Sequence, residues 1–490
     1  MDYPDPDVIR VEDTYYMVST TMHFMPGCEI LQSFDLVHWE HVTYVYETLD
    51  HTDAQQLKSG QNIYGQGMWA ASLRYHEGRF CICFVANDTR KTYLYTSEKI
   101  DGPWKKQLIE GFYHDGSLLF DEDGRNYIVY GNDEIWITEL NEDLTAPKKD
   151  GLHRLLVSDH KNPELGYEGS HIQKINGYYY IFLVHSLRDR WMRTEACFYS
   201  DSLEGEFTGG DVLCDDRGYC GQGVAQGGIV DTPDGKWYAM LFQDSGAVGR
   251  IPILLPVTWK DHFPFFGQNG HVPEEIEVHS TRPGYIYQPL VGSDDFCNGL
   301  LPRWQFNHDP DPRYYHLDAL QGTYTITTRE VCTELTQAVN TLTQRMSYPS
   351  CAAEVTVDAS ALKEGDVAGL CALQSCYAAV GITKHHGKYE VLMLDKKEDG
   401  ILDMTEGTVV ESHQMDFRLE ADFCNMKDEA RCYYRVNKGD WLPIGTVHKL
   451  YFKLDHFTGC RFGLFCYAAE ETGGSACFRD FKYYDVDEIS

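Results

Sequence analysis

Five copies of an internal repeat carry three carboxylates, a tryptophan and a glutamine at equivalent positions. Counting back ten to twelve residues from the aromatic start of five successive hairpins reaches Asp5, Trp69, Asp115, Glu168 and Gln226. Converging carboxylic acids raise each other's pKa, so one can stay protonated at neutral pH while another is ionised. Glycoside hydrolysis uses that pairing, because one group protonates the leaving oxygen and the other activates water or attacks. A tryptophan would add an apolar platform for a sugar face.

The stretch YPDPDVIR, which begins at Tyr3, places Asp5 between two prolines. Each proline fixes its own φ and pushes the residue before it towards an extended conformation, so Asp5 is expected to be stiffly held. The alternative is an N-terminal turn with solvated acids, since Asp and Pro are ordinary turn residues. Asp7 is interpreted as a turn cap or a solvated side chain and is assigned no chemistry.

Other uses of these residues stay open at this point. Metal binding is the rival use of three carboxylates, and it ranks lower because the five positions include no histidine. Glu168 could be a turn acid beside Gly169, and Asp115 could be a turn residue before Gly116. Trp69 could pack in a core.

Five copies of a turn followed by an aromatic strand would position these side chains. They read VEDTYYMVST, HEGRFCICFV, DEDGRNYIVYG, INGYYYIFLVHS and PDGKWYAMLFQD. Four of them contain Glu-Gly, Asp-Gly or Asn-Gly, which is a hairpin signal between apolar strands. Five units of roughly 50 residues predict a five-bladed β-propeller, in which equal phase means similar depth around the central channel. A large irregular sandwich of similar hairpins is the alternative.

Around His279 the repeat stops, and alternating segments such as GTYTITT, CAAEVTVDA and YEVLMLD follow. This alternation is typical of an antiparallel sandwich. The chain is therefore predicted to be all-β, with a five-bladed β-propeller over residues 1–285 and a β-sandwich over residues 286–490. The sandwich could be a stabilising module or a carbohydrate-binding one.

The composition narrows the class of partner. The 490 residues carry a formal net charge of -33, which argues against nucleic acid and membrane partners. No run of about 18 apolar residues and no basic-then-apolar N-terminal segment is visible. The 16 cysteines form no CxxC pair, which favours free thiols in a cytoplasmic protein, although a secreted chain trimmed of its leader would look the same. The oligomeric state is not readable.

Five motifs in order resemble glycoside hydrolase family 43. They are YPDPDVIRVEDTYYMVSTT, HDGSLLFDEDGRNYIVYG, GYEGSH, QGGIVDTPDGKWYAMLFQD and GRIPILLPVTW, and the resemblance covers nearly the whole chain. Similar members are exo-acting β-xylosidases and α-L-arabinofuranosidases, which invert anomeric configuration and carry a propeller followed by a sandwich. The resemblance implies release of xylose or arabinose from plant (arabino)xylo-oligosaccharides. An α-L-arabinofuranosidase without xylosidase activity and a non-catalytic glycan-binding propeller are the alternatives.

The resemblance also implies roles for single residues. Asp5 would be the general base and Glu168 the general acid, while Asp115 would orient the acid and tune its pKa. Arg250, in VGRIPI, would contact the bound sugar. Trp69 and Phe24 are further expected substrate contacts.

Two positions concern the closure of the site and a metal ion. In similar members a loop of the second domain narrows the funnel, and Phe457 in DHFTG is the candidate for that contact. A place for this Phe in the sandwich core is the equal alternative. Many relatives carry a histidine near the propeller axis, often beside calcium, where this chain has Gln226. No cofactor is required, but a calcium ion could still meet the amide oxygen of Gln226.

Overall fold

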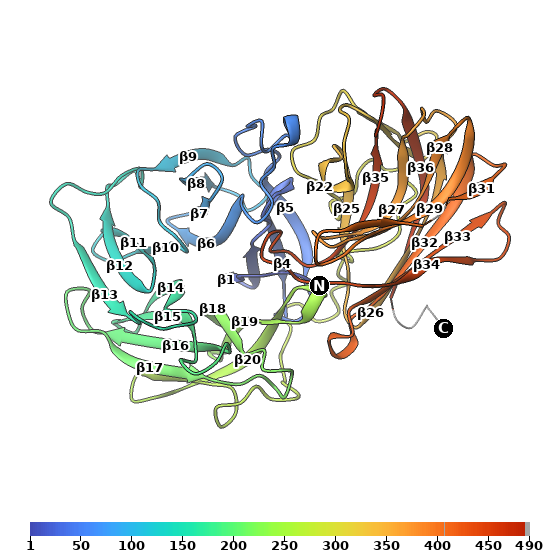
Figure 1. The fold of residues 1–490 in the computed structure, drawn as a ribbon. Coiled ribbons are helices and arrows are strands. Elements are labelled where there is room, and N and C mark those ends of the chain that lie inside the picture. The colour runs from blue at the N-terminus through green and yellow to red at the C-terminus, as the bar shows by residue number, and fades with distance from the viewer. Residues whose placement is uncertain (406, 486–490) are drawn as a thin grey trace.

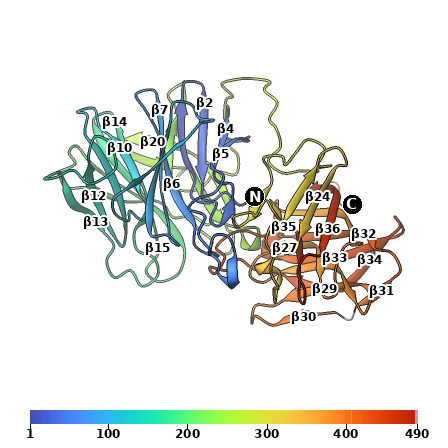
Figure 2. The ribbon, with the colours of Figure 1, turned by 90° about the horizontal axis from the view of Figure 1, so that it is seen from above.

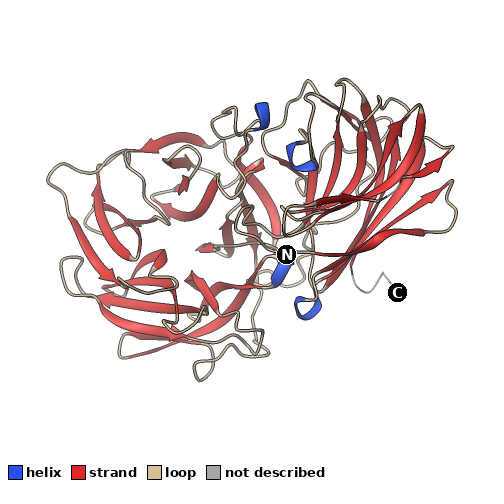
Figure 3. Cartoon of the chain, in the orientation of Figure 1, coloured by secondary structure: helices blue, strands red, loops and turns tan. Residues whose placement is uncertain are grey.

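The computed structural model describes residues 1–405 and 407–485. Within them, strands dominate and the helices are four 3-10 turns of three residues each (Figure 3). None of these helices is long and apolar enough to cross a membrane. Two bodies lie side by side, a propeller from the first half of the chain and a sandwich from the second (Figure 1). The predicted all-β propeller-plus-sandwich fold is confirmed.

The propeller consists of five four-stranded antiparallel sheets, each built from strands in chain order. Blade 1 contains β1 (Asp7–Val11), β2 (Thr14–Ser19), β4 (Gly27–Ser33) and β5 (Glu40–Tyr46). Blade 2 contains β6 (Met68–His76), β7 (Arg79–Ala86), β8 (Lys91–Ser97) and β9 (Lys105–Ile109). Blade 3 contains β10 (Ser117–Phe120), β11 (Asn126–Asn132), β12 (Glu134–Leu140) and β13 (His153–Ser158).

The last two blades follow the same plan. Blade 4 contains β14 (Glu168–Ile175), β15 (Tyr178–Ser186), β16 (Arg193–Ser200) and β17 (Thr208–Leu213). Blade 5 contains β18 (Val224–Asp231), β19 (Trp237–Asp244), β20 (Arg250–Lys260) and β21 (Phe263–Phe266). The turn between β14 and β15 shows why the repeat folds this way. Asn176 and Gly177 have φ values of 50° and 85°, as a two-residue hairpin turn with both central residues left-handed requires.

The first strand of every blade lines the central channel. β1 packs against β6 and β18, β10 packs against β6 and β14, and β14 packs against β18, which closes a ring of five. Apolar side chains fill the spaces between neighbouring blades. The mouth of the channel at the N-terminal ends of these first strands is called the funnel below. Residues that precede the five hairpins by a similar number of positions therefore lie at a similar depth in the channel.

The second domain is a sandwich of two antiparallel sheets around one large apolar core. One sheet has the order β3-β22-β25-β35-β27-β28-β29-β30, with β31 also on β29. Its members are β3 (Phe24–Met25), β22 (Gln305–Asn307), β25 (Leu342–Arg345), β27 (Val367–Leu373), β28 (Ala378–His385), β29 (Lys388–Lys396), β30 (Leu402–Met404), β31 (Thr408–Val410) and β35 (Arg461–Tyr467). The predicted division between residues 285 and 286 falls between β21 and β22.

The other sheet has the order β23-β24-β36-β26-β32-β33-β34. Its members are β23 (Tyr315–Asp318), β24 (Thr323–Thr327), β26 (Ser350–Asp358), β32 (Gln414–Asp422), β33 (Glu429–Val436), β34 (Leu442–Lys449) and β36 (Ser475–Asp485).

Seen from above, the propeller and the sandwich lie beside one another (Figure 2), and they share a sheet edge. β3 comes from the propeller, yet it pairs with β22 of the sandwich, with Asn307 opposite Phe24. A buried ion pair also joins the domains, with Arg345 Nη1 2.7 Å from Glu29 Oε2. Backbone pairing and a buried ion pair fix the sandwich relative to the funnel, so a sandwich loop can contribute to a site in the propeller.

Candidate active site

The predicted carboxylates lie where the first strands begin. Asp5 precedes β1, Asp115 precedes β10, and Glu168 is the first residue of β14. Asp5 and Asp115 have φ values of 52° and 48°. Non-glycine residues with positive φ are uncommon, and such strained positions cluster at functional sites. The left-handed backbone therefore interrupts the regular alternation of side chains at Asp5 and Asp115, where the funnel begins.

The expectation that Asp5 is extended is wrong. Its backbone is left-handed, and the surrounding contacts hold it there. The hydroxyl of Ser19 donates to the carbonyl of Pro4 at 2.6 Å, and the hydroxyl of Thr20 donates to Asp5 Oδ2 at 2.7 Å. Tertiary hydrogen bonds thus override the preference that a following proline imposes. The other carboxylate oxygen, Oδ1, lies 3.3 Å from Arg250 Nη1.

Glu168 and Asp115 share a histidine that the repeat did not reveal. His114 Nε2 lies 3.6 Å from Asp115 Oδ2 and 3.6 Å from Glu168 Oε2. The side-chain amide of Asn132 donates to Glu168 Oε2 at 2.6 Å, and the Gly169 N–H donates to Asp115 Oδ2 at 3.0 Å. The acid expected to donate a proton is therefore held by two polar side chains from the neighbouring blade.

The charges in this cluster are strongly coupled. The pKa of Asp115 is raised to about 6, chiefly by burial; His114 opposes the rise, and the nearby Glu168 and Asp5 add to it. The negative charge of Asp115 raises the pKa of His114 to about 9, against burial and with help from Glu168 and Asp5. His114 is thus a cation at neutral pH and lies between the carboxyl groups of Asp115 and Glu168. The mutual effects also indicate that all three acids share one site.

His114→Gln should change how stability depends on pH. A raised pKa in the folded state stabilises it fully below the unfolded value of about 6.5, and this contribution is lost as pH rises through about 9. The melting temperature of the wild type should therefore exceed that of the variant most near pH 6, and the difference should shrink towards pH 10. Calorimetry across this range measures it. A difference that stays constant with pH would mean that His114 does not act through its charge.

Trp69, Arg250 and Phe457 meet at the same funnel. The Phe457 ring lies 5.6 Å from the Trp69 ring, and the Arg250 guanidinium lies 4.4 Å above the Phe457 ring. Arg250 Nη2 also donates to the backbone carbonyl of Phe457 at 3.2 Å. Phe457 is half-buried and contacts the propeller, so it does not occupy the sandwich core. Within the described residues, the buried Trp69 Nε1 and Arg250 Nε have no hydrogen-bond partner.

Gln226 packs beside the acid. Its backbone, with φ of 66°, lies at a register shift in β18, and its N–H donates to Glu195 Oε2 at 2.7 Å. A Cβ on Gly169, whose φ is also 66°, would lie 2.8 Å from Gln226 Cγ, so only glycine fits next to Glu168.

The predicted calcium ligand does not gain a matching set of donors. Calcium takes six to eight oxygen ligands. In the part of the chain that the structure describes, the cluster of His, Cys, Asp and Glu side chains close enough to hold a cation jointly is His114, Asp115 and Glu168. A protonated His114 would oppose a cation there. The donors do not fit calcium, and no step below involves it.

Phe24 is not a substrate contact in this structure. Its side chain is 1% exposed, and its strand β3 is paired with β22 of the sandwich. The guanidinium of Arg461 lies 3.5 Å above its ring. Phe24 is part of the core at the domain junction, because the backbone pairing draws it away from the funnel.

Asp7 is neither a turn cap nor a solvated acid. It is buried, and its Oδ2 accepts from Arg74 Nη1 and the Leu73 N–H, both at 2.7 Å. Its Oδ1 lies 3.1 Å from His171 Nδ1. Asp7 therefore ties the first strands of blades 1, 2 and 4 together deeper in the channel.

Sequence reasoning missed three residues that touch the acids, namely Thr20, His114 and Asn132. Counting back from hairpins finds one residue at the start of each first strand, whereas Thr20 directly follows the second strand of its blade and Asn132 ends the second strand of its own. His114 carried a usable signal, since it directly precedes Asp115 in the sequence. Its side chain would have supplied the histidine that the five positions lack.

Both halves of the chain match models of known protein families. Residues 1–264 match the family model of the glycosyl hydrolases family 43. Residues 293–484 match the beta xylosidase C-terminal concanavalin A-like domain. The chain is 26% identical to a beta-xylosidase of Formosa agariphila, over 99% of this chain and 88% of that protein.

Two solved structures are similar over the whole chain. A bifunctional GH43-CE protein of Bacteroides eggerthii is 42% identical with a TM-score of 0.92, and the match covers 100% of this chain but only 63% of that one. A GH43 enzyme engineered to display endo-xylanase and exo-arabinofuranosidase activity is 27% identical with a TM-score of 0.86, over 99% and 98% of the two chains. This chain therefore belongs to glycoside hydrolase family 43 and is a glycoside hydrolase.

Proposed function

We propose that the enzyme is exo-acting and inverting, and that it releases xylose or arabinose from the ends of plant (arabino)xylo-oligosaccharides. The observation that carries the proposal is the placement of Asp5 and Glu168 on first strands that are not neighbours in the ring, with Asp115 in the same site. Similarity to a beta-xylosidase and to an engineered exo-arabinofuranosidase supports the choice of pentoses.

In this proposal Asp5 acts as the general base. Thr20 and Arg250 hold its two oxygens, so the carboxylate keeps one orientation as it draws a proton from water. The water attacks the anomeric carbon on the face opposite the leaving group. Inverting enzymes leave room for this water by separating the two carboxyl groups by roughly 6.5–9.5 Å, which is our expectation for Asp5 and Glu168.

Glu168 acts as the general acid and gives its proton to the leaving oxygen. Asn132 orients the carboxyl group, and Asp115 accepts the N–H of the adjacent Gly169. The cation on His114 offsets the charge that builds up on Glu168 as its proton leaves. Preorganised charge of this kind stabilises a transition state without reorganisation during the reaction.

The exo preference is assigned to Phe457. This sandwich residue meets Trp69 and Arg250 of the propeller at the funnel, so the two domains narrow the opening together. A narrowed funnel admits a chain end and excludes the middle of a polymer. An α-L-arabinofuranosidase without xylosidase activity is the second candidate, favoured by the similarity to the GH43 enzyme engineered to display exo-arabinofuranosidase as well as endo-xylanase activity.

Hydrolysis of nitrophenyl β-xyloside and nitrophenyl α-L-arabinofuranoside, measured side by side, tests the proposal. We expect turnover of at least the xyloside, with α-xylose as the first product in proton NMR spectra. Turnover of the arabinofuranoside alone would establish the second candidate. First appearance of β-xylose would overturn inversion, and no turnover of either compound would overturn the substrate class. The Asp5→Asn protein, purified in the same way, controls for contaminating activity.

A further inference from the structure

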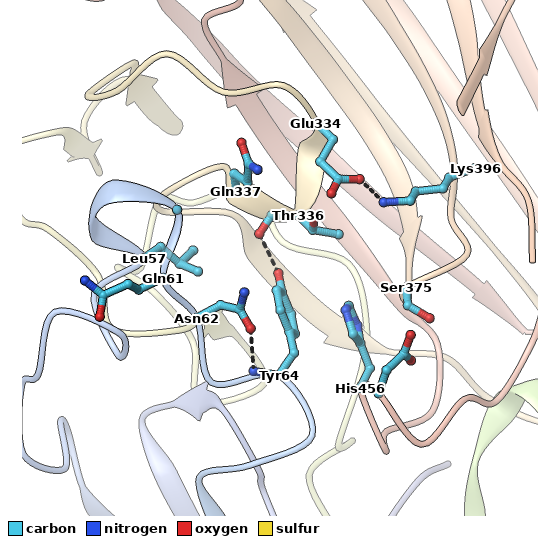
Figure 4. A pocket seen from close by; sticks show the side chains of 12 residues that line it. Leu57, Gln61, Asn62, Tyr64, Glu334, Thr336, Gln337, Ser375, Lys396 and His456 are labelled. Atoms are coloured by element: carbon cyan, nitrogen blue, oxygen red, sulfur yellow. Dashed lines mark hydrogen bonds and ion pairs between the residues drawn. The ribbon is translucent and has the colours of Figure 1, made fainter. Parts of the chain in front are cut away.

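A second cavity lies at the domain junction, outside the funnel (Figure 4). Its volume of about 280 Å³ is close to the lower end of small-ligand sites, roughly 300–1,000 Å³. One wall is the propeller segment with Gln61, Asn62 and Tyr64, and the other is sandwich structure with Glu334, Ser375 and Lys396. Ligand sites occur preferentially at such domain boundaries.

The lining offers hydrogen-bond donors and acceptors at close range. Glu334 and Lys396 form an ion pair across the sandwich wall. Asn62 Oδ1 accepts the Tyr64 N–H at 3.2 Å, which leaves the amide nitrogen of Asn62 to donate elsewhere. Ser375 also lines the cavity, with its hydroxyl oxygen buried in the wall.

The charges of the lining side chains favour a neutral ligand in this cavity. The cavity holds one cation, Lys396, against the carboxylates of Glu334 and Asp455, and the chain carries a net charge of -33. These charges repel phosphates and other anions. Glu334 is already paired with Lys396, which leaves Asp455 as the one remaining carboxylate among the lining residues and gives a cation a poor ligand set. Hydroxyl, amide and paired charged groups together suit the adjacent hydroxyls of a neutral saccharide.

The cavity adjoins the loop that closes the funnel. The rings of Tyr64 and His456 stack in parallel with centroids 3.8 Å apart, and the Tyr64 hydroxyl donates to the Thr336 carbonyl at 2.7 Å. His456 lines the cavity, whereas the next residue, Phe457, faces the funnel. One short loop therefore has a face on each site.

We propose that this junction cavity is a second saccharide-binding site, which takes a neutral mono- or disaccharide separately from the funnel. This second site rests on the proposed function only in that pentoses are chosen as the probes. Because its walls come from both domains, a bound saccharide holds the propeller segment, the sandwich and the loop of Phe457 together. Binding there stabilises the closed funnel without a sugar at the catalytic carboxylates.

Titration calorimetry with xylose, arabinose and xylobiose tests this site in the Glu168→Gln background, where turnover is blocked. Adding Lys396→Met should weaken one class of binding at least about tenfold, since it removes a charged hydrogen-bond partner. Lys397→Met is the matched control, because Lys397 pairs with Asp403 on the surface, and it should leave the isotherms unchanged. In the otherwise wild-type enzyme, Lys396→Met should keep kcat/KM on nitrophenyl glycosides within about twofold.

Identical isotherms with and without Lys396→Met, for all three sugars, would overturn the site. If Lys396→Met does not fold, Asn62→Ala answers the same question, because it removes a side-chain amide that lines the cavity. Saccharide should also raise the melting temperature of Lys397→Met more than that of Lys396→Met, as expected for a ligand of the folded state. Binding that depends on Lys396 in a protein inactive on both nitrophenyl glycosides would refute the proposed function and support this site.

Discussion

Glu168→Gln is expected to lower kcat on xylosides with poor leaving groups by ~100- to 10,000-fold, the usual contribution of general acid catalysis. Glutamine keeps the size of the side chain and a contact to Asn132, but it has no carboxyl proton to donate. Substrates with very good leaving groups need little protonation, so the same variant should lose much less on dinitrophenyl xyloside. A series of aryl xylosides of graded leaving-group pKa measures this dependence.

Asp5→Asn should lose a similar factor on every member of that series. The base acts on the attacking water, so the leaving group cannot compensate for its loss. Asp13→Asn is a suitable control, since Asp13 is a surface-exposed carboxylate at the turn between β1 and β2 that binds Arg282. It should leave the rates unchanged. Equal rescue of Asp5→Asn and Glu168→Gln by good leaving groups would reverse or abolish the assignment of base and acid.

The ring of side chains could be predicted because the hairpin geometry is local. Two-residue turns such as Asn176–Gly177 set the register of first and second strands, so a constant offset from the hairpin reaches a constant depth. The offset varies from ten to twelve residues mainly because the hairpin loops differ in length. Two residues separate β14 from β15, where the offset is ten, whereas five separate β10 from β11, where it is twelve.

The missed features depend on contacts between distant segments. Phe24 looked like an aromatic at the funnel, but its pairing with Asn307 removes it, and that partner is more than 280 positions away. Asn132 reaches Glu168 from the next blade, and the left-handed backbone of Asp5 depends on hydrogen bonds from Ser19 and Thr20. Local propensity contains none of this information, because each contact exists only once the blades have packed around the axis.

Arg250→Met should reduce both stability and turnover. The Arg250 side chain is 1% exposed, its Nη1 lies 3.3 Å from Asp5 Oδ1, and its Nη2 donates to the Phe457 carbonyl. Removing one partner of a buried ion pair costs about 3–5 kcal/mol, because the other charge stays buried without compensation. Asp5 also loses one of its two positioning contacts, and a misplaced catalytic group costs on the order of 100-fold in rate. Chemical unfolding and kcat/KM on the same preparation measure both effects.

Phe457→Ala tests the role of the Phe457 ring without removing the backbone carbonyl that Arg250 binds. The substitution keeps the backbone oxygen and removes the surface that meets Trp69, so KM should rise while the free energy of unfolding changes little. A Phe→Ala change in a packed core would instead cost about 3–5 kcal/mol. A large loss of stability with unchanged KM would therefore place Phe457 in the structural framework and remove the sandwich from the active site. If the free energy of unfolding of Arg250→Met equals that of the wild type, the ion pair with Asp5 does not stabilise the funnel.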